Sequence, residues 1–327
     1  MRRVKQFFYI NSILQILLHI LELNYYFINI FPDHENELKK INDDIYVKGR
    51  LSKEYHKIVQ RIYNIDDYNN CFVNSRDFID FLINNNISKS KIDANEFLSD
   101  ILQILHTELN YHGDRKLKNI LKCNKLIEKE SFNFFKTVKS NLNLSKISYM
   151  FYGILKSRFT CDYCKKNLYN FQYFQYLNFS LFNFQGKPFN LYNGFKELIK
   201  SGSMSKYYCQ NCKCLRNMKF ENIIYSAPPY LIINIYYGKN KNYKPLKVSF
   251  GGIIYIKDFV DKYEKSPHIS YELIAVISHI EDSVITYCKN YENKWYKFTY
   301  STIIETAFDN IESNFPDILI YKKIKNN

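Results

Sequence analysis

Two short cysteine motifs decide the fold of this chain: Cys161-Asp-Tyr-Cys164 and Cys209-Gln-Asn-Cys212. Each motif holds two thiols at the spacing of a zinc knuckle, and 44 residues separate the two motifs. Four thiolates bind Zn²⁺ tetrahedrally and leave no coordination position open for a substrate. The sequence therefore predicts a structural zinc site, and any chemistry must lie elsewhere in the chain.

A further cysteine, Cys214, lies two residues after the second motif and offers an alternative ligand. We favour Cys212 because a two-residue spacer suits the turn of a knuckle. A chance pair of motifs is the other interpretation, and the predicted strands beside both pairs argue against it. Zinc at this site is expected to contribute directly to folding.

The composition indicates a large folded protein. The 327 residues are 46% hydrophobic and 17% aromatic, which is enough for a packed core and excludes general disorder. Eight cysteines in so long a chain, partly at metal-ligand spacing, favour reduced thiols, so we predict a cytoplasmic or nuclear protein. The net charge of +14 comes mostly from lysines spread along the chain, which is a weaker signal for nucleic acid than a clustered arginine stripe.

The start of the chain imitates a membrane anchor. Residues 7–31 are rich in Ile, Leu and aromatic side chains, but polar residues such as Asn11, Gln15 and His19 interrupt them. No apolar span of about 20 residues is present. We therefore predict a buried helix of a soluble protein and no membrane partner.

The sequence pattern changes from helical to extended near residue 145. Apolar residues recur at helical spacing after Ser12, which we predict to cap the first helix, and two more helices are predicted over 78–82 and 93–109. A later helix is predicted over 191–200. Mixed aromatic and polar residues predict strands over 167–184, 219–225, 231–237, 247–256, 271–278, 283–288, 295–300 and 317–322. A helical half followed by an antiparallel sheet is an α+β architecture.

Six local strings, in this order, resemble the ubiquitin-specific protease family of papain-like cysteine peptidases. They are Asn11–Leu17 with Tyr25–Phe27, Asp93–Leu98, the two cysteine motifs, Ala227–Ile233, Tyr271–His279 and Tyr287–Phe298. The resemblance covers nearly the whole chain and implies one domain over residues 1–327. It implies a mainly helical thumb (1–145), zinc-ribbon fingers (146–226) and an antiparallel-sheet palm (227–327).

The resemblance also identifies the positions of the family's catalytic triad, and this chain keeps none of its residues. Members use a Cys nucleophile, a His base and an orienting Asp or Asn. Phe8, Ser283 and Thr299 occupy these three positions, and Arg3 falls near the position of the oxyanion-binding Asn. A benzyl group cannot attack a carbonyl, and serine is no base near neutral pH. The resemblance therefore implies a deubiquitinase fold without turnover.

One cysteine imitates the family's nucleophile string, Cys71-Phe-Val-Asn-Ser. Only 22 positions separate Cys71 from Asp93, and no Leu-Gln helix follows it, so we favour a loop cysteine over a displaced nucleophile. His279 ends an apolar run and is interpreted as structural rather than as a displaced base. Cys123 and Cys288 are interpreted as core thiols.

Two acidic residues open the helix predicted over 93–109. Asp93 and Glu96 are three residues apart and share a helix face. The resemblance implies that they contact the basic C-terminal tail of ubiquitin. Acids in a first turn also favour the helix dipole, and that interpretation stays open.

Three functions are consistent with this sequence. The first is a protein that binds ubiquitin, a ubiquitinated protein or another protein partner without hydrolysis. The second is an active thiol-dependent ubiquitin hydrolase with Cys71 as a rewired nucleophile. The third is an inactive scaffold of a ribonucleoprotein complex, as in the splicing-associated branch of the family. Structural zinc is the one cofactor that the sequence predicts.

Overall fold

The computed structural model describes most of the 327-residue chain. The described residues are 2–41, 50–63, 75–85, 94–110, 127–139, 145–184, 188–238, 247–261, 269–280, 283–299, 302–312 and 315–324, without the side chains of 2–8, 39–41, 137–139, 183, 280 and 283. The chain divides into two compact units. The first contains Met1–Asp114, Leu144–Ser148 and Ile274–Leu319, and the second contains Arg115–Asn143, Tyr149–Leu273 and Ile320–Asn327.

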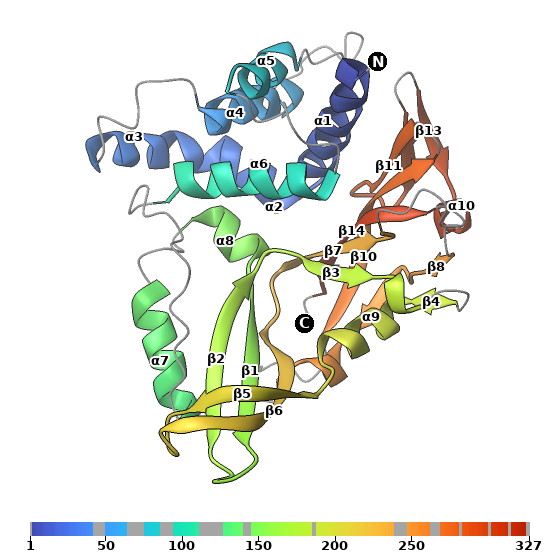
Figure 1. The fold of residues 1–327 in the computed structure, drawn as a ribbon. Helices are drawn as coiled ribbons and strands as arrows, with labels where there is room; N and C mark the ends of the chain where they lie inside the picture. The colour runs from blue at the N-terminus through green and yellow to red at the C-terminus, as the bar shows by residue number, and fades with distance from the viewer. Residues whose placement is uncertain are drawn as a thin grey trace. The chain divides into compact units, whose positions relative to one another are not determined.

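The first unit combines helices with an antiparallel ladder of strands (Figure 1). Its helices are α1 (Arg2–Leu18), α2 (Leu21–Asn29), α3 (Phe31–Ile41), α4 (Leu51–Tyr63), α5 (Arg76–Asn84), α6 (Ala94–Glu108), the start of α8 (Lys146–Phe151) and α10 (Phe308–Glu312). Its strands are β11 (Ser283–Lys289), β12 (Trp295–Phe298), β13 (Ile303–Thr306) and parts of β10 (Ser270–Ile280) and β14 (Pro316–Lys323). The strand order is β13-β12-β11-β10-β14.

Buried polar groups join the helices of the first unit. Asn24 on α2 donates from Nδ2 to the backbone oxygen of Leu18 at 2.6 Å and accepts from Tyr55 Oη on α4 at 2.8 Å. Glu108, at the end of α6, accepts from two backbone amides at the start of α4 at 3.0 and 2.8 Å. The carboxylate thus pairs amides that have no partner within α4 itself, which fixes the two helices to each other.

The predicted start of the first helix is wrong. Helix α1 begins at Arg2, so Ser12 lies inside the helix as a buried residue and does not cap it. Tyr9 and Ile10 are also buried, and the apolar pattern that precedes Ser12 therefore extends the helix toward the N-terminus. No helix within the described segments is long and apolar enough to cross a membrane.

The second unit contains a four-stranded antiparallel sheet that we call the finger sheet, in the order β2-β1-β6-β5. Its strands are β1 (Gly153–Cys161), β2 (Asn167–Phe174), β5 (Gly202–Cys209) and β6 (Cys214–Ser226). The unit also contains α7 (Glu128–Lys139), β3 (Leu177–Ser180), η1 (Phe182–Phe184), β4 (Phe189–Asn190), α9 (Leu191–Leu198), β7 (Tyr230–Tyr236), β8 (Val248–Ser249), β9 (Ile253–Tyr255) and η2 (Lys257–Phe259). The pairs β3–β7 and β4–β8 are parallel.

The α+β class predicted from the sequence is confirmed, with differences in detail. The strand predicted over 247–256 is two short strands, β8 and β9, because Phe250–Gly252 interrupts it. Strands β1 and β5 were missed. Both are rich in polar side chains, and their pairing with β6 makes them strands.

A buried ion cluster holds the base of the finger sheet. Lys156 on β1 donates to Asp261 and, at 2.8 Å, to Glu128 Oε1 on α7. Burial alone would lower the pKa of Lys156, but the two carboxylates outweigh this effect and raise the pKa above its ordinary value. The ammonium therefore stays charged although the residue is only 8% exposed.

Asp261→Ala is expected to lower the free energy of unfolding by about 3–5 kcal/mol, because it leaves the buried ammonium of Lys156 without its most buried partner. Glu221→Ala is the matched control, since it breaks the exposed pair between Glu221 and Arg158 and should cost less than about 1 kcal/mol. Urea unfolding followed by fluorescence measures both. Equal losses in the two variants would contradict a special role for the buried cluster.

Candidate functional site

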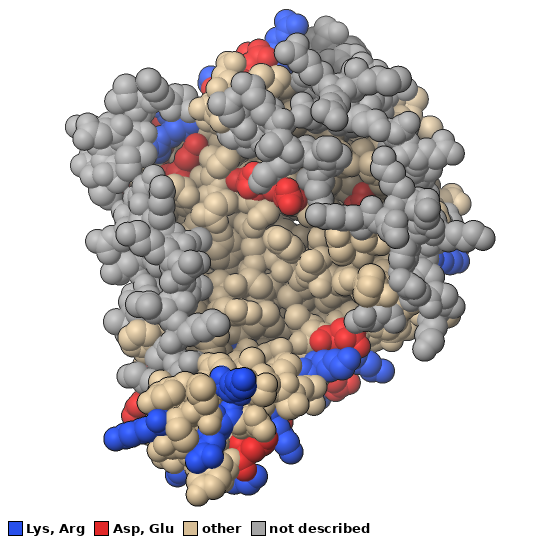
Figure 2. Space-filling model, viewed as in Figure 1, with Lys and Arg blue, Asp and Glu red and all other residues tan. Residues whose placement is uncertain are grey.

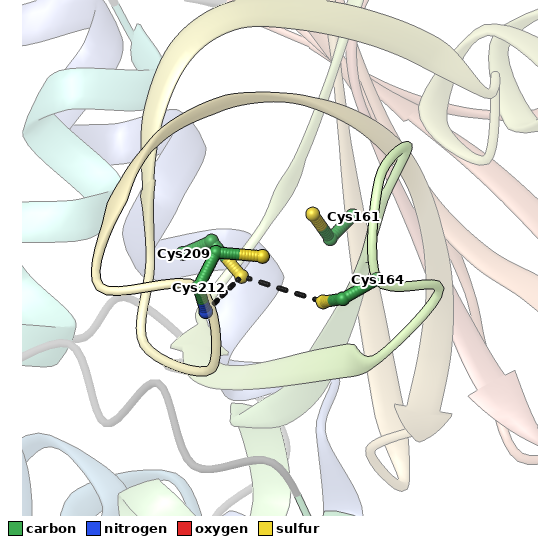
Figure 3. A group of neighbouring side chains, drawn as sticks. All are labelled: Cys161, Cys164, Cys209 and Cys212. Carbon is green, nitrogen blue, oxygen red and sulfur yellow. Dashed lines mark hydrogen bonds between the residues drawn. The ribbon is translucent and has the colours of Figure 1, made fainter.

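The four predicted metal ligands lie together at the end of the finger sheet (Figure 3). Cys161 and Cys164 come from the β1–β2 turn, and Cys209 and Cys212 come from the β5–β6 turn. Their sulfur atoms all lie within 4.8 Å of one another. The two turns meet because β1 pairs with β6, with Cys161 opposite Met218. Cys214 is not part of this group.

The spacing of the sulfur atoms fits a zinc ion and does not fit a disulfide. Sγ of Cys164 and Sγ of Cys209 are 3.7 Å apart, whereas a disulfide bond is about 2.05 Å long. A tetrahedral ion with Zn–S bonds of about 2.3 Å holds any two sulfurs about 3.8 Å apart. Four cysteine ligands are typical of closed structural sites. The cluster can hold a structural zinc ion and offers it no catalytic position.

The thiols of the cluster need a cation before all four can ionise. A hydrogen bond from the backbone of Lys166 lowers the pKa of Cys164 to about 6. Burial, followed by the neighbouring thiols, raises the pKa of Cys212 to about 12. Zn²⁺ binds the deprotonated form and offsets the repulsion among four thiolates, so metal binding and thiol ionisation are coupled.

Arg216 and Tyr163 lie beside the cysteine cluster, and the sequence analysis did not predict a role for either residue. The guanidinium carbon of Arg216 lies 4.3 Å from the centroid of the Tyr163 ring. The charges of Cys214 and Cys212 contribute to a raised pKa of Arg216, so this side chain places a permanent cation next to the thiols. A cation outside the ligand shell offsets the net negative charge of a four-thiolate zinc site. The sequence contains no usable signal for Arg216, because a single Arg after a cysteine motif is a common pattern.

The elements that carry the three predicted catalytic positions meet in the first unit. Phe8 lies in α1, which packs against β11, and Ser283 begins β11. Thr299 follows β12, whose Phe298 pairs with Thr286, so Thr299 and Ser283 lie at the same end of this ladder. The side chains of Phe8 and Ser283 are outside the described residues, and the roles of these positions stay predictions.

The backbone at Phe8 is helical, six residues after the start of α1 at Arg2. An amide this far into a helix donates to the carbonyl four residues earlier, whereas only the first four amides of a helix are free to bind an anion. A residue at position 8 therefore lacks the free helix N-terminus that can activate a thiol or bind an oxyanion.

Thr299 is hydrogen-bonded to Thr302. Its Oγ1 lies 2.6 Å from Thr302 Oγ1 and accepts from Thr302 N at 3.1 Å, and its backbone amide donates to Thr302 O at 2.9 Å. These bonds join the residue that follows β12 to the residue that precedes β13. Threonine also has neither the carboxylate nor the amide group that orients the His base in family members.

A polar cluster that sequence reasoning missed lies near the predicted positions. His279 Nδ1 on β10 is 2.9 Å from Tyr9 Oη on α1 and 3.8 Å from Asp317 Oδ2 on β14. Tyr9 follows Phe8 in the chain, and His279 pairs with Val284 on β11. The contacts favour the structural interpretation of His279. In the sequence, only the position of Tyr9 next to the predicted nucleophile position could have drawn attention to this cluster. Asp317 could not have been linked to His279, because it lies on a strand distant in the sequence.

The remaining candidates are divided between described and undescribed segments. Glu96 is exposed in the first turn of α6, whereas Asp93, Cys71 and Cys123 lie outside the described residues. Cys288 is fully buried on β11, and burial raises the pKa of its thiol, as expected for a core cysteine.

The α+β fold with its finger sheet ending in a four-cysteine group defines a protein built around a structural zinc site. The profile of the family described as "Ubiquitin carboxyl-terminal hydrolase" matches residues 6–321, and the chain belongs to this family.

Relatives in the family are distant and longer. The chain is 28% identical over 190 residues to "Probable ubiquitin carboxyl-terminal hydrolase 16" of Schizosaccharomyces pombe, a match that covers 55% of this chain and 40% of that protein. It is 23% identical over 248 residues to "Ubiquitin carboxyl-terminal hydrolase 25" of Arabidopsis thaliana, covering 71% and 33%. The matches thus span less than half of either relative.

Solved structures confirm the fold. A chain of the SAGA DUB module of Ubp8, Sgf11, Sus1 and Sgf73 is similar with a TM-score of 0.71 at 20% identity, covering 98% of this chain and 68% of that chain. A chain of the same module bound to ubiquitin aldehyde is similar with a TM-score of 0.68 at 20% identity and the same coverage. At this identity the likeness establishes the fold and leaves function to be argued.

Proposed function

We propose that this chain binds ubiquitin or a ubiquitinated protein and does not hydrolyse it, in the cytoplasm or the nucleus. One observation carries the proposal: the family's fold and cysteine cluster are kept, while the sequence resemblance assigns Phe8 to the position of the nucleophile. A phenylalanine has no atom that can attack a carbonyl, and no neighbouring base can change that.

There is a physical reason why a protein can still bind its partner after its catalytic activity is lost. Affinity for a protein partner is distributed over a wide surface with a few dominant contacts, whereas hydrolysis depends on a handful of atoms in one arrangement. One structure similar to this chain is bound to ubiquitin aldehyde, which supports ubiquitin as the partner. The exposed Glu96 on α6 is available to a basic segment such as the tail of ubiquitin.

Calorimetric titration of the zinc-loaded chain with monoubiquitin tests the proposal. We expect saturable binding that Asp93→Lys with Glu96→Lys weakens by about tenfold or more, because each reversal sets two like charges against each other. Asp77→Lys with Asp80→Lys is the matched control, since these exposed acids on α5 have the same spacing and belong to the same unit. Absence of saturable binding would refute the proposal, and equal losses in both pairs would refute the assigned tail contact.

A ribonucleoprotein role has one observation in its favour, the concentration of positive charge on the finger sheet. The alternative of an active enzyme with a rewired nucleophile depends on Cys71, which lies outside the described residues. Labelling with a ubiquitin propargyl probe tests this alternative.

A further inference from the structure

Positive charge is concentrated on the finger sheet. Residues 153–174 and 202–226 hold eight of the chain's 46 Lys and Arg but only two of its 32 Asp and Glu. Lys156 is buried in its ion cluster, and Arg158 pairs with Glu221. The cations that remain, opposed by Asp162, are Lys165, Lys166, Lys206, Lys213, Arg216 and Lys219. Figure 2 shows Lys and Arg, with some Asp and Glu between them, over the part of the molecule that holds the finger sheet.

The two knuckle turns bring these cations to one end of the finger sheet, where Lys219 and Arg216 of β6 project from opposite faces. Lys165 and Lys166 follow the first knuckle, and Lys213 follows the second. The backbone amide of Asp162 donates to the backbone oxygen of Asn217 at 3.0 Å, which ties the first turn to β6. All five lysines of the group are exposed, whereas Cys161 and Cys209 are buried. The lysines are therefore open to solvent and to ligands.

Three of these lysines adopt a left-handed backbone conformation, which is unfavourable for lysine. Lys165, Lys206 and Lys213 have φ of 58°, 57° and 54°, and among the other described residues only Asn293 and Gly238 have positive φ. The left-handed region costs energy for every residue with a Cβ, and glycine would remove that cost. Lysines that keep such a conformation at three places in one sheet point to a use for their charge.

Exposed aromatic rings lie at the same end of the finger sheet, Tyr208 on the face of Leu215 and Tyr163 with Arg216 on the other. Tyr163 is 72% exposed and Tyr208 is 54% exposed, and Leu215, opposite Tyr208 in the β5–β6 ladder, is 59% exposed. Arg216 stacks on the Tyr163 ring. Cations that meet phosphates and rings that stack on bases are the two elements of single-stranded nucleic-acid sites. An acidic peptide would match the charge but would leave the rings without a partner.

We propose that the knuckle end of the finger sheet, which carries the five exposed lysines with Arg216, Tyr163 and Tyr208, binds single-stranded nucleic acid that passes around this end. The contacts are to phosphates and base faces, so binding depends weakly on base sequence and strongly on salt. The function goes beyond ubiquitin binding and uses neither Glu96 nor the predicted catalytic positions, so each proposal can fail without the other.

Fluorescence anisotropy of a labelled single-stranded oligonucleotide of about 12 residues, titrated with the zinc-loaded chain over a salt series, measures this binding. We expect Lys166→Glu/Lys213→Glu/Lys219→Glu to weaken binding at least about tenfold. The salt slope should fall by about 2, because each phosphate that a lysine neutralises adds about 0.7 to it. The control Lys129→Glu/Lys196→Glu/Lys257→Glu changes the charge equally at exposed lysines of the same unit. It should alter affinity by less than about threefold.

The aromatic rings separate nucleic acid from other polyanions. Tyr163→Ala and Tyr208→Ala should each weaken binding about tenfold, while Phe at either position should preserve stacking and affinity. Zinc content and thermal unfolding verify that each variant is folded. The proposal is overturned by absence of binding at low salt, by an equal loss in the control triple variant, by insensitivity to both alanine substitutions, or by equal or tighter binding of a polyglutamate peptide.

Discussion

Cys209→Ser is expected to abolish zinc binding and to unfold the end of the finger sheet. Structural zinc contributes about 10–16 kcal/mol of apparent binding free energy in zinc-finger peptides. The apolar cluster at this end is small: its buried members are Cys161, Leu168, Cys209 and Met218, and two of the four are zinc ligands. A core of this size cannot hold a sheet that loses its metal, because hydrophobic burial scales with the area removed from water.

Two measurements check this prediction. Release of zinc to a chromogenic chelator reports metal content, and hydrogen exchange over residues 153–174 and 202–226 reports the order of the sheet. Cys214→Ser is the matched control: its thiol lies in the same hairpin but outside the four-sulfur group, so zinc content and exchange should be unchanged. Full zinc occupancy and normal exchange in Cys209→Ser would show that the metal lies elsewhere.

Local patterns were sufficient to predict the knuckles and most of the strands. The ligand spacing within each knuckle involves six residues or fewer, so it can be recognised locally. A tetrahedral metal site needs two such knuckles, which allowed the second motif to be assigned to the same site as the first although 44 residues separate them. The strands of β10, β11 and β12 carry apolar and aromatic runs that are visible without knowledge of their partners.

Long-range pairing explains what the sequence could not show. Lys156 looks like a surface residue, and it is buried because Asp261, 105 positions later, reaches it. Tyr9 and His279 are 270 positions apart, and only the fold shows that they share a hydrogen bond. Ser12 matched the pattern of a helix cap, but α1 begins ten residues earlier, at Arg2, and Tyr9 and Ile10 before Ser12 are buried. In each case tertiary packing outweighed a local preference.

The unmodified, zinc-loaded chain is expected to leave a fluorogenic ubiquitin C-terminal amide intact and to resist labelling by a ubiquitin propargyl probe. Loss of the nucleophile alone lowers kcat by about 10⁶-fold in a serine protease triad, and the resemblance assigns Ser283 and Thr299 to the base and orienting positions as well. An alkylating agent should therefore make no difference to the residual rate. Labelling that disappears in Cys71→Ala would support the rewired enzyme and contradict this prediction.

Restoring the lost groups tests the assigned positions directly. Phe8→Cys alone supplies a thiol with a pKa of about 8.5, of which a few per cent ionises at pH 7, and Ser283→His alone has no thiol to activate. We expect the probe to label Phe8→Cys/Ser283→His much faster than either single variant, since α1 packs against β11. Hydrolysis should stay slow even then, because the amide of residue 8 donates within α1 and the oxyanion lacks that donor. Equal labelling of Phe8→Cys with and without Ser283→His would show that residue 283 is not the base position, and the neighbouring His279 would be the next candidate to substitute.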